Sequence, residues 1–298
     1  MRKSSPAKKK GVLYVVATPI GNREDITLRA LNVLSETDLV AAEDTRKSND
    51  LLSHYGIKKR LVSLHEHNEL KRTPQLIDKL LNGTTIALIS NAGTPSVSDP
   101  GYRLIDAAIA NNIAVTPVPG VNAATAAMSV SGLPTDSFVF IGFAPKKKGK
   151  RLRFLTELGD EHRPLIFYES PKRIVALMEE IISCMGDRKA VLAREMTKLH
   201  EEFIRASLSE IIKTMAARSA VKGECTLLVA GCEASGEIDA EMVKAAIKAA
   251  IKKNPSGSSK IAREIAQKYG ISKNEVYDLV LRFRGQMSED SGQKSDDE

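Results

Sequence analysis

The chain has 298 residues, of which 42% are hydrophobic and 27% charged, as in soluble globular proteins. No apolar run approaches the roughly 20 residues that cross a bilayer, and no signal-type apolar segment follows the basic N-terminus. The formal net charge of +7 favours a polyanionic partner, because Lys and Arg release counterions from phosphates. Three scattered cysteines argue against a disulfide framework and a cysteine metal site. We therefore expect a cytoplasmic protein.

The first part of the chain, residues 11–143, alternates short apolar runs with amphipathic segments. Continuous apolar runs are typical of strands that are buried on both faces. The expected strands are Val12–Ala17, Leu39–Ala42, Thr85–Ser90, Ile113–Pro117 and Phe138–Phe143. Helices are expected near Leu28–Leu34, Arg46–Tyr55, Thr73–Leu81, Tyr102–Ala110 and Ala123–Val130. This alternation predicts an α/β domain with a mostly parallel sheet.

The remaining chain is divided by composition. Residues 1–10 are expected to be a basic disordered tail, and the Lys-rich residues 144–150 a basic linker. Residues 151–232 predict a second α/β domain, with strands at Leu165–Tyr168, Ala190–Ala193 and Cys225–Ala230 and helices at Pro171–Met185 and Leu208–Ala217. Residues 239–285 predict a helical module with helices at Asp239–Lys252, Ser259–Tyr269 and Lys273–Arg284, and residues 286–298 an acidic disordered tail.

The last two predicted helices are separated by Gly270-Ile271-Ser272. A helix, a tight turn with glycine and a second helix form the helix-turn-helix pattern. A small helical bundle would use the same spacing for packing, so both interpretations stay open.

Three loops combine Gly or Pro with small polar residues directly after predicted strands: Thr18–Asn22, Ser90–Gly101 and Pro117–Ala124. In open parallel sheets, ligands bind at the carboxyl ends of the strands. One such loop would indicate only a turn, but three favour a ligand crevice. None matches the phosphate-binding loop of nucleotide triphosphatases or the complete dinucleotide fingerprint, which disfavours both enzyme classes.

Acidic side chains follow a further predicted strand. Glu43 and Asp44 come directly after Leu39–Ala42, where they could act as a general base or orient a hydroxyl group. Asp44 could equally cap the helix that follows. His65 and His67 are the nearest imidazoles, and because no third ligand is evident, we expect no metal site.

Taken together, the motifs identify a family. The segments TPIGNREDITLRAL, AAEDTR, SNAGTPSVSDPGYRLI, PVPGVNAATAAMSVSGLP, FYESPKRI and AREMTKLHEEF occur in this order along the chain. They resemble the ribosomal small-subunit RNA cytidine 2′-O-methyltransferase branch of the tetrapyrrole methylase superfamily. The resemblance covers about Gly11 to Gly231 and continues into the C-terminal helical module.

The resemblance implies two α/β domains with a cleft for S-adenosylmethionine between them, and a homodimer. It implies that the methyl acceptor is the 2′-hydroxyl of a cytidine in the decoding region of 16S ribosomal RNA, cytidine 1402. The 30S subunit is the expected substrate, and naked RNA stays an alternative. Carried over residue by residue, the expected cofactor contacts are Pro19, Ala92, Gly93, Thr94, Val97, Asn122, Ala123, Glu169 and Thr226.

One position departs from the pattern that the resemblance implies. Asn91 stands where an aspartate is expected, and an amide cannot act as a base at neutral pH. Because a ribose hydroxyl is a poor nucleophile, we look for the base among Glu43 and Asp44, then Asp99, then His65. RNA binding is expected from the basic cluster Lys146, Lys147, Lys148, Lys150, Arg151 and Arg153.

Two other functions use the same features. A methylase of a small tetrapyrrole would share the fold and the cofactor, but it would need neither the basic cluster nor the C-terminal module. A nucleic-acid-binding regulator would use the helix-turn-helix pattern on duplex DNA without any methyl transfer. Both predict that methyl groups do not enter ribosomal RNA.

Overall fold

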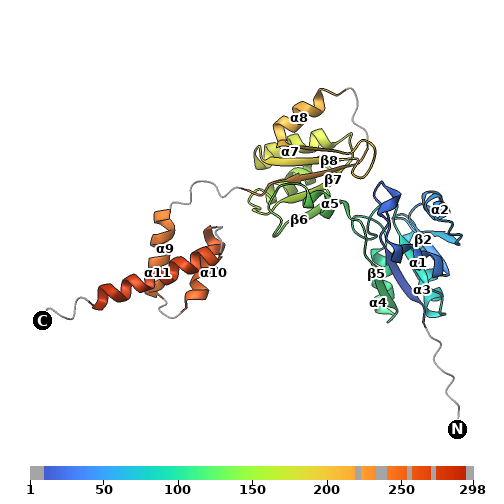
Figure 1. Cartoon of the computed structure of the whole chain (residues 1–298), viewed down its shortest axis with the longest axis horizontal. Coiled ribbons are helices and arrows are strands. Elements are labelled where there is room, and N and C mark those ends of the chain that lie inside the picture. The colour runs from blue at the N-terminus through green and yellow to red at the C-terminus, as the bar shows by residue number, and fades with distance from the viewer. Residues whose placement is uncertain (1–9, 219–222, 233–239, 254–256, 270–272, 293–298) are drawn as a thin grey trace, which may run out of the picture. The chain divides into compact units, whose positions relative to one another are not determined.

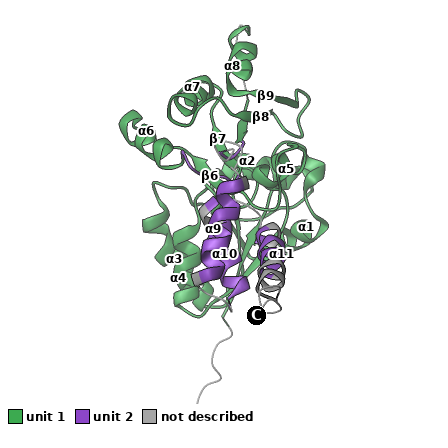
Figure 2. Cartoon of the chain, turned by 90° about the vertical axis from the view of Figure 1, so that its left-hand side faces the viewer, with its two compact units in different colours: residues 1–158, 164–229 green, residues 159–163, 230–298 purple. Residues whose placement is uncertain are grey.

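The computed structural model describes residues 10–218, 223–232, 240–253, 257–269 and 273–292 (Figure 1). They fall into two compact units, which Figure 2 shows in different colours. The first unit comprises residues up to 158 together with 164–229, and the second comprises 159–163 and residues from 230 onwards. Among the described helices, none is long and apolar enough to cross a membrane.

The first unit contains a five-stranded sheet that is parallel throughout. Its strands are β1 (Val12–Val16), β2 (Leu39–Ala42), β3 (Leu61–Ser63), β4 (Ile86–Ile89) and β5 (Ala114–Val118), in the order β3-β2-β4-β1-β5. Every residue of β2 and β4 is buried, as expected of strands covered on both faces. The predicted parallel sheet is confirmed. The short edge strand β3 was not predicted, because its three half-buried residues carry no clear pattern.

Helices cover both faces of this sheet. They are α1 (Leu28–Glu36), α2 (Thr45–His54), α3 (Glu69–Leu81) and α4 (Tyr102–Ala110). Leu34 of α1 and Leu52 of α2 pack on one face, and Leu80 of α3 and Leu104 of α4 pack on the other. The side chain of Thr27 caps α1 by accepting a hydrogen bond from the Ala30 backbone nitrogen at 3.1 Å.

A second five-stranded sheet follows. Its strands are β6 (Val139–Phe143), β7 (Leu165–Glu169), β8 (Lys189–Arg194), β9 (Glu202–Ser207) and β10 (Cys225–Val229), in the order β6-β7-β10-β8-β9. Only β6 and β7 are parallel, and the other three pairs are antiparallel. Its neighbouring helices are α5 (Ala123–Ser129), α6 (Lys148–Glu157), α7 (Ile174–Met185) and α8 (Leu208–Ala216).

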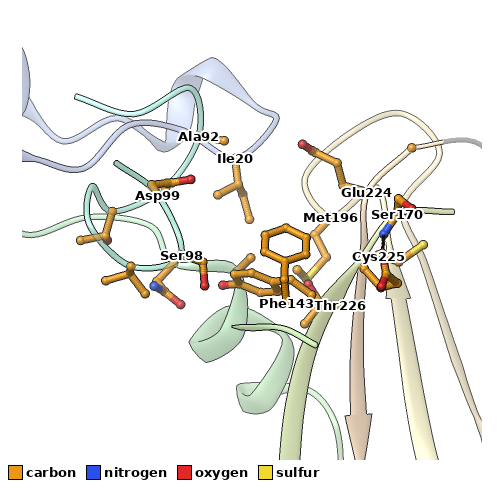
Figure 3. A pocket seen from close by; sticks show the side chains of 18 of the residues that line it. Ile20, Ala92, Ser98, Asp99, Phe143, Ser170, Met196, Glu224, Cys225 and Thr226 are labelled. Atoms are coloured by element: carbon orange, nitrogen blue, oxygen red, sulfur yellow. Dashed lines mark hydrogen bonds between the residues drawn. The ribbon is translucent and has the colours of Figure 1, made fainter. Parts of the chain in front are cut away.

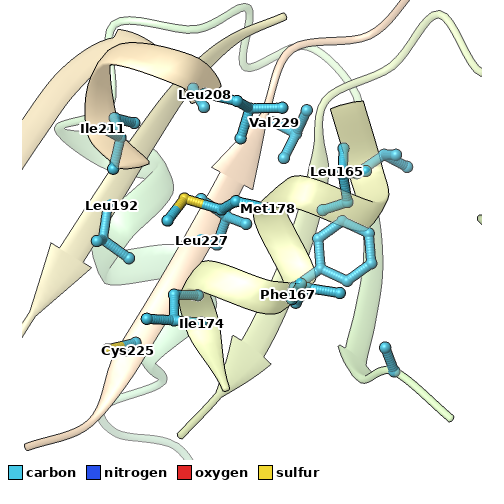
Figure 4. Close-up of a cluster of buried hydrophobic side chains, with 14 of the residues drawn as sticks. Leu165, Phe167, Ile174, Met178, Leu192, Leu208, Ile211, Cys225, Leu227 and Val229 are labelled. Carbon is cyan, nitrogen blue, oxygen red and sulfur yellow. The ribbon is translucent and has the colours of Figure 1, made fainter. Parts of the chain in front are cut away.

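The alternation of side chains gives the second sheet two apolar faces. Figure 4 shows Phe167, Leu192 and Leu227 packed with Ile174 and Met178 of α7 in one core, which also holds residues of α6 and α8. The opposite face packs against α5 through its own cluster. Both faces are thereby covered.

The boundary between the two α/β domains is earlier than residue 143, where we placed it. Phe138–Phe143 was assigned to the first domain, but β6 pairs with β7 of the second sheet. Helix α5 also packs against the second sheet, through Ala124, Ala127 and Met128. The chain therefore leaves the first sheet after Val118. A pattern of strands and helices does not reveal which sheet a strand joins.

The basic linker predicted at 144–150 was also wrong. Ala144 is buried in the core of the second sheet, and Lys148 begins helix α6. Arg151 fixes this helix to α7, because its guanidinium lies 2.5 and 2.8 Å from the two carboxylate oxygens of Glu180. Its Nη1 also donates to the carbonyl oxygens of Pro145 and Lys146 at 3.0 Å. Arg151 therefore has a structural role, and its predicted contact with RNA stays a prediction.

The described residues of the second unit form three helices, α9 (Ala240–Lys253), α10 (Ser258–Tyr269) and α11 (Lys273–Gly292). They share one apolar core, which includes Val243, Ile247, Ile261, Ile265 and Val280. The predicted turn at 270–272 and the tail at 1–9 lie outside the described residues. The disordered tail predicted from residue 286 is wrong in its first part, because α11 runs to Gly292.

Candidate functional site

A cavity of about 310 Å³ lies in the first unit, between the predicted ligand loops and the second sheet. This volume is at the lower end of the range usual for small-molecule sites. Figure 3 shows Ile20, Ala92 and Asp99 on one side of it and Met196, Glu224 and Thr226 on the other, with Phe143 between them. Loops after β1, β4 and β5 thus face residues at the ends of β7, β8 and β10.

The loop after β4 is held in one conformation. Gly93 has a φ of +76°, and its backbone nitrogen and oxygen pair with those of Thr18 at 2.9 and 2.8 Å. Gly101 has a φ of +131°, and a Cβ there would lie 2.7 Å from Leu88 Cδ2, so glycine is required. The buried Glu69 carboxylate accepts hydrogen bonds from the backbone nitrogens of Gly101 and Arg103 at 3.1 and 3.0 Å. These contacts fix both ends of the loop.

The structure brings together nearly all the residues that we expected to bind the cofactor. The residues that line the cavity are Ala92, Gly93, Thr94, Val97, Asn122, Ala123, Glu169 and Thr226. Pro19 lines a neighbouring cavity instead. The role of the eight residues as cofactor contacts stays a prediction. Contacts to one cofactor must lie around one cavity, as these residues do.

The wall formed by α5 and β7 is tied together by polar contacts. Asn122 caps α5, with its side-chain oxygen 2.9 Å from the backbone nitrogen of Ala124. The same nitrogen donates to the Tyr168 hydroxyl at 3.0 Å. Glu169, only 6% exposed, accepts hydrogen bonds from Ser170 and Arg173. These side chains are therefore held in place without a ligand.

Sequence reasoning placed Ile20 in a ligand loop but did not identify Phe143, Met196 or Glu224 as part of this wall. Ile20, Phe143 and Met196 line the cavity, as does Glu224. The only available signal was the dense charge of residues 194–198 directly after an apolar strand, which indicated a crevice without identifying its residues. Side chains from β6 could not be placed there, because that strand was assigned to the other sheet.

Asp99 is the carboxylate that meets the requirements of a general base. It lines the cavity, and burial raises its pKa to about 6, helped by the nearby carboxylates of Glu43 and Glu224. The nearby Ser90 hydroxyl offsets part of this rise in the pKa of Asp99. A base with a pKa close to the working pH accepts protons efficiently.

The other candidates lie outside the cavity lining. Glu43 Oε2 accepts a hydrogen bond from the Asn91 backbone nitrogen at 3.0 Å, which holds the loop after β4. Asp44 Oδ1 accepts one from the Arg46 nitrogen at 2.9 Å and caps α2, and its other oxygen pairs with the Arg46 guanidinium. His65 lies beside His67 and does not line the cavity either. Of the four candidates for the base, Asp99 is the one that lines the cavity, and the identity of the base stays a prediction.

Asp44 should therefore contribute to folding rather than to turnover. Asp44→Asn keeps a capping oxygen and removes the charge that pairs with Arg46. We expect a melting temperature slightly below that of the wild type and an unchanged kcat. Parallel thermal melts and steady-state assays check this. A large loss of kcat with normal melting would return Asp44 to the mechanism.

Comparison with known proteins gives the family. Residues 12–212 match the family of tetrapyrrole (corrin/porphyrin) methylases. The chain belongs to the tetrapyrrole methylase family. It is 50% identical over 222 residues to "Ribosomal RNA small subunit methyltransferase I" of Halalkalibacterium halodurans, covering 74% of this chain and 76% of that protein. The protein of the same name from Mesorhizobium japonicum is 43% identical over 281 residues, or 94% and 95% of the two chains.

Solved structures of this methylase family have the same fold. The uroporphyrin-III C-methyltransferase of Thermus thermophilus, crystallised with S-adenosylhomocysteine, superposes with a TM-score of 0.53 at 20% identity. The match covers 73% of this chain and 97% of that one. The family and the fold class expected from the motifs are thereby confirmed. Among the described residues of the methylase, no group of three or more His, Cys, Asp or Glu is placed to hold a metal ion.

Proposed function

We propose that this methylase transfers a methyl group from S-adenosylmethionine to the ribose 2′-hydroxyl of a cytidine in 16S ribosomal RNA, with cytidine 1402 as the expected site. The observation that carries the proposal is the extent of the similarity. The relative named as a ribosomal RNA methyltransferase matches 94% of the chain, so the match includes most of the C-terminal helical unit. A methylase of a small tetrapyrrole would not need that unit.

The cavity has the chemistry that this cofactor needs. S-adenosylmethionine carries a positive sulfonium and an ammonium group, and Asp99 and Glu224 bring carboxylates to the cavity wall. Ile20, Val97 and Met196 offer apolar surface to the adenosine. When bound, S-adenosylmethionine supplies a methyl group whose bond to sulfur breaks as the bond to the ribose oxygen forms, and the electron pair stays on sulfur.

The chain itself positions the groups and accepts a proton. The loops after β1, β4 and β5 hold the two reactants in line, and orientation of this kind accounts for on the order of 7–11 kcal/mol of barrier reduction at best. The Asp99 carboxylate takes the proton that the 2′-hydroxyl loses. Its raised pKa, about 6, makes it a better proton acceptor than an ordinary aspartate.

A direct assay tests this function. The purified chain is incubated with methyl-labelled S-adenosylmethionine and small subunits whose ribosomal RNA has not been methylated at this site. We expect label in 16S ribosomal RNA as a 2′-O-methylcytidine. Label in an added porphyrinoid but none in RNA would favour the small-molecule methylase, and specific duplex DNA binding without any transfer would favour the regulator.

We also propose that the enzyme works as a cytoplasmic homodimer on the assembled 30S subunit. Support for a protein interface comes from α4, where Tyr102 and Ile109, seven residues apart, are 70% and 61% exposed. Light scattering measures the mass in solution. Comparing naked 16S RNA with 30S particles in the methylation assay identifies the substrate.

The exposed part of the basic cluster is proposed to hold RNA. Apart from Arg151, its members are exposed: Lys146, Lys147, Lys148, Lys150 and Arg153. Replacing the four lysines with alanine should weaken RNA binding and lower the slope of log Kd against log salt by about 0.7 for each phosphate that the variant no longer binds. Filter binding at several salt concentrations measures this. A slope equal to that of the wild type would remove the cluster from the interface.

A further inference from the structure

A second cavity of about 290 Å³ lies directly beside the cofactor cavity. Ile20, Ala92 and Glu224 line both cavities and form the boundary between them. The rest of the lining comes from the loop after β1, helix α2 and the start of the loop after β4, namely Pro19, Gly21, Arg23, Lys47, Ser48, Leu51, Ser90 and Asn91, together with Lys198.

The two cavities differ in charge. The charged side chains of the first are the carboxylates of Asp99, Glu169 and Glu224. The second cavity is lined by more basic than acidic side chains, namely Arg23, Lys47 and Lys198 against Glu224. Lys198 is neutralised there by Glu195 and Glu224, whose oxygens lie 2.9 and 2.7 Å from its Nζ. Within the part of the chain that the structure describes, the side chains of Arg23 and Lys47 form no ion pair. The second cavity therefore suits an anion, whereas the first suits a cation, because its Asp99 carboxylate forms no ion pair with a described residue.

The second cavity also contains polar groups at its base. Ser48 and Ser90 are 4% and 3% exposed. The side-chain oxygen of Asn91 is buried and accepts no hydrogen bond from the described residues. Buried acceptors in proteins normally accept a hydrogen bond. The Asn91 oxygen therefore indicates a site for a ligand that carries an N–H or O–H group.

Ser90 connects the two cavities. It lines the second cavity, and its hydroxyl, which donates to the Ala92 carbonyl oxygen at 3.2 Å, is near enough to the Asp99 carboxyl of the first cavity to lower its pKa. A hydroxyl group at the boundary could therefore reach the base from the second cavity, while the methyl donor occupies the first. This arrangement is what a reaction between two separate ligands requires.

We propose that the second cavity binds the target nucleotide of the RNA substrate, with its phosphate on Arg23 and Lys47 and a nucleotide donor group on Asn91. This inference rests on the proposed function, and it adds the site where the nucleotide that receives the methyl group binds. Arginine and lysine are the usual phosphate ligands. Leu51, Pro19 and Ile20 supply apolar surface for the sugar or base.

The test compares two double variants of the full chain. Arg23→Ala with Lys47→Ala removes both cations from the cavity. Arg29→Ala with Lys58→Ala removes the same charge from exposed positions outside both cavities. A third variant, Arg23→Lys with Lys47→Arg, keeps the charge. All are measured for KM and kcat on 30S subunits, for S-adenosylhomocysteine affinity, and for binding of a decoding-region oligoribonucleotide across salt concentrations.

We expect the cavity variant to raise KM about tenfold or more and to lower the salt slope by about 0.7 for each phosphate that it no longer binds. Its affinity for S-adenosylhomocysteine should match the wild type, which shows that the fold is intact. The surface variant should behave like the wild type. The charge-keeping variant should keep the salt slope, but its KM should lie between those of the wild type and the cavity variant, because the positions of the N–H donors differ between arginine and lysine. Equal KM and slope in the cavity and surface variants would overturn the inference.

If the proposed function is wrong, the experiment gives a result that differs from failure of the inference. In that case the wild-type chain methylates no ribosomal RNA at all. Binding of the oligoribonucleotide to the chain loaded with S-adenosylhomocysteine then decides the inference alone. Binding that depends on Arg23 and Lys47 supports it, and wild-type binding that is absent or independent of them overturns it.

Discussion

Replacing Asp99 with asparagine should lower kcat by about 10²- to 10⁴-fold, the usual contribution of a general base. The amide has nearly the same shape but cannot accept the hydroxyl proton. Affinity for S-adenosylhomocysteine should change little, because this product lacks the positive sulfonium. Single-turnover methylation of 30S subunits and calorimetric titration of the product measure the two effects separately. Wild-type turnover in Asp99→Asn would remove Asp99 from the mechanism.

The same variant has a pH signature. Burial raises the pKa of Asp99 in the folded chain to about 6, above its ordinary value of about 3.9. Wild-type kcat should therefore rise with pH through about 6 and then level off. Between about pH 4 and 6 the folded state binds more protons at this site than the unfolded state, so its contribution to stability falls as pH rises. Asp99→Asn should lose both dependences and melt no lower than the wild type above pH 6.

Gly21→Ala should weaken cofactor binding strongly, because Gly21 lies where the two α/β domains touch. A Cβ on this residue would lie 2.5 Å from Lys198 Cγ, 2.7 Å from Thr197 Oγ1 and 2.9 Å from the Met196 carbonyl oxygen. The next residue, Asn22, donates its backbone N–H to Thr197 Oγ1 at 2.8 Å. The alanine side chain can fit only if this contact moves. The same movement would shift Ile20 relative to Met196, which lines the other side of the cofactor cavity.

We expect the Kd of Gly21→Ala for S-adenosylhomocysteine to rise about tenfold or more, equivalent to about 1.4 kcal/mol. Gly149→Ala is the matched control. Gly149 lies in α6, where an added Cβ meets nothing within 4 Å, and alanine favours a helix by about 0.5–1 kcal/mol over glycine. Calorimetry and thermal melts measure both variants. Equal affinity in the two would show that the contact at Gly21 does not shape the cavity.

The sequence predicted the first sheet and its ligand loops well. Runs such as Leu39–Ala42 and Ile86–Ile89 are buried on both faces, so their apolar pattern is continuous. The glycines and prolines that follow mark where the strands end. Because parallel strands end at one edge of a sheet, Ala92 and Asn122 could be expected in one crevice although 30 positions separate them.

Other features depend on tertiary contacts that have no local signal. Arg151 and the neighbouring lysines have the same charge in sequence, and only the position of Glu180 makes Arg151 a structural residue. Glu43, Asp44 and Asp99 are similar carboxylates in the sequence, and only the fold places Asp99 in the lining of the cofactor cavity. The second cavity combines residues from α2, from two loops and from the turn after β8, so no single segment predicts it.

We propose above that this methylase modifies the 2′-oxygen of one cytidine in 16S ribosomal RNA. Mass-spectrometric mapping of 2′-O-methyl groups on ribosomal RNA tests it most directly, in cells that lack the protein and in the same cells complemented with the wild type or with Asp99→Asn. We expect one 2′-O-methylcytidine in the decoding region to disappear, to return with the wild type and to stay absent with Asp99→Asn. An unchanged methylation map in cells that lack the protein would contradict the proposed function.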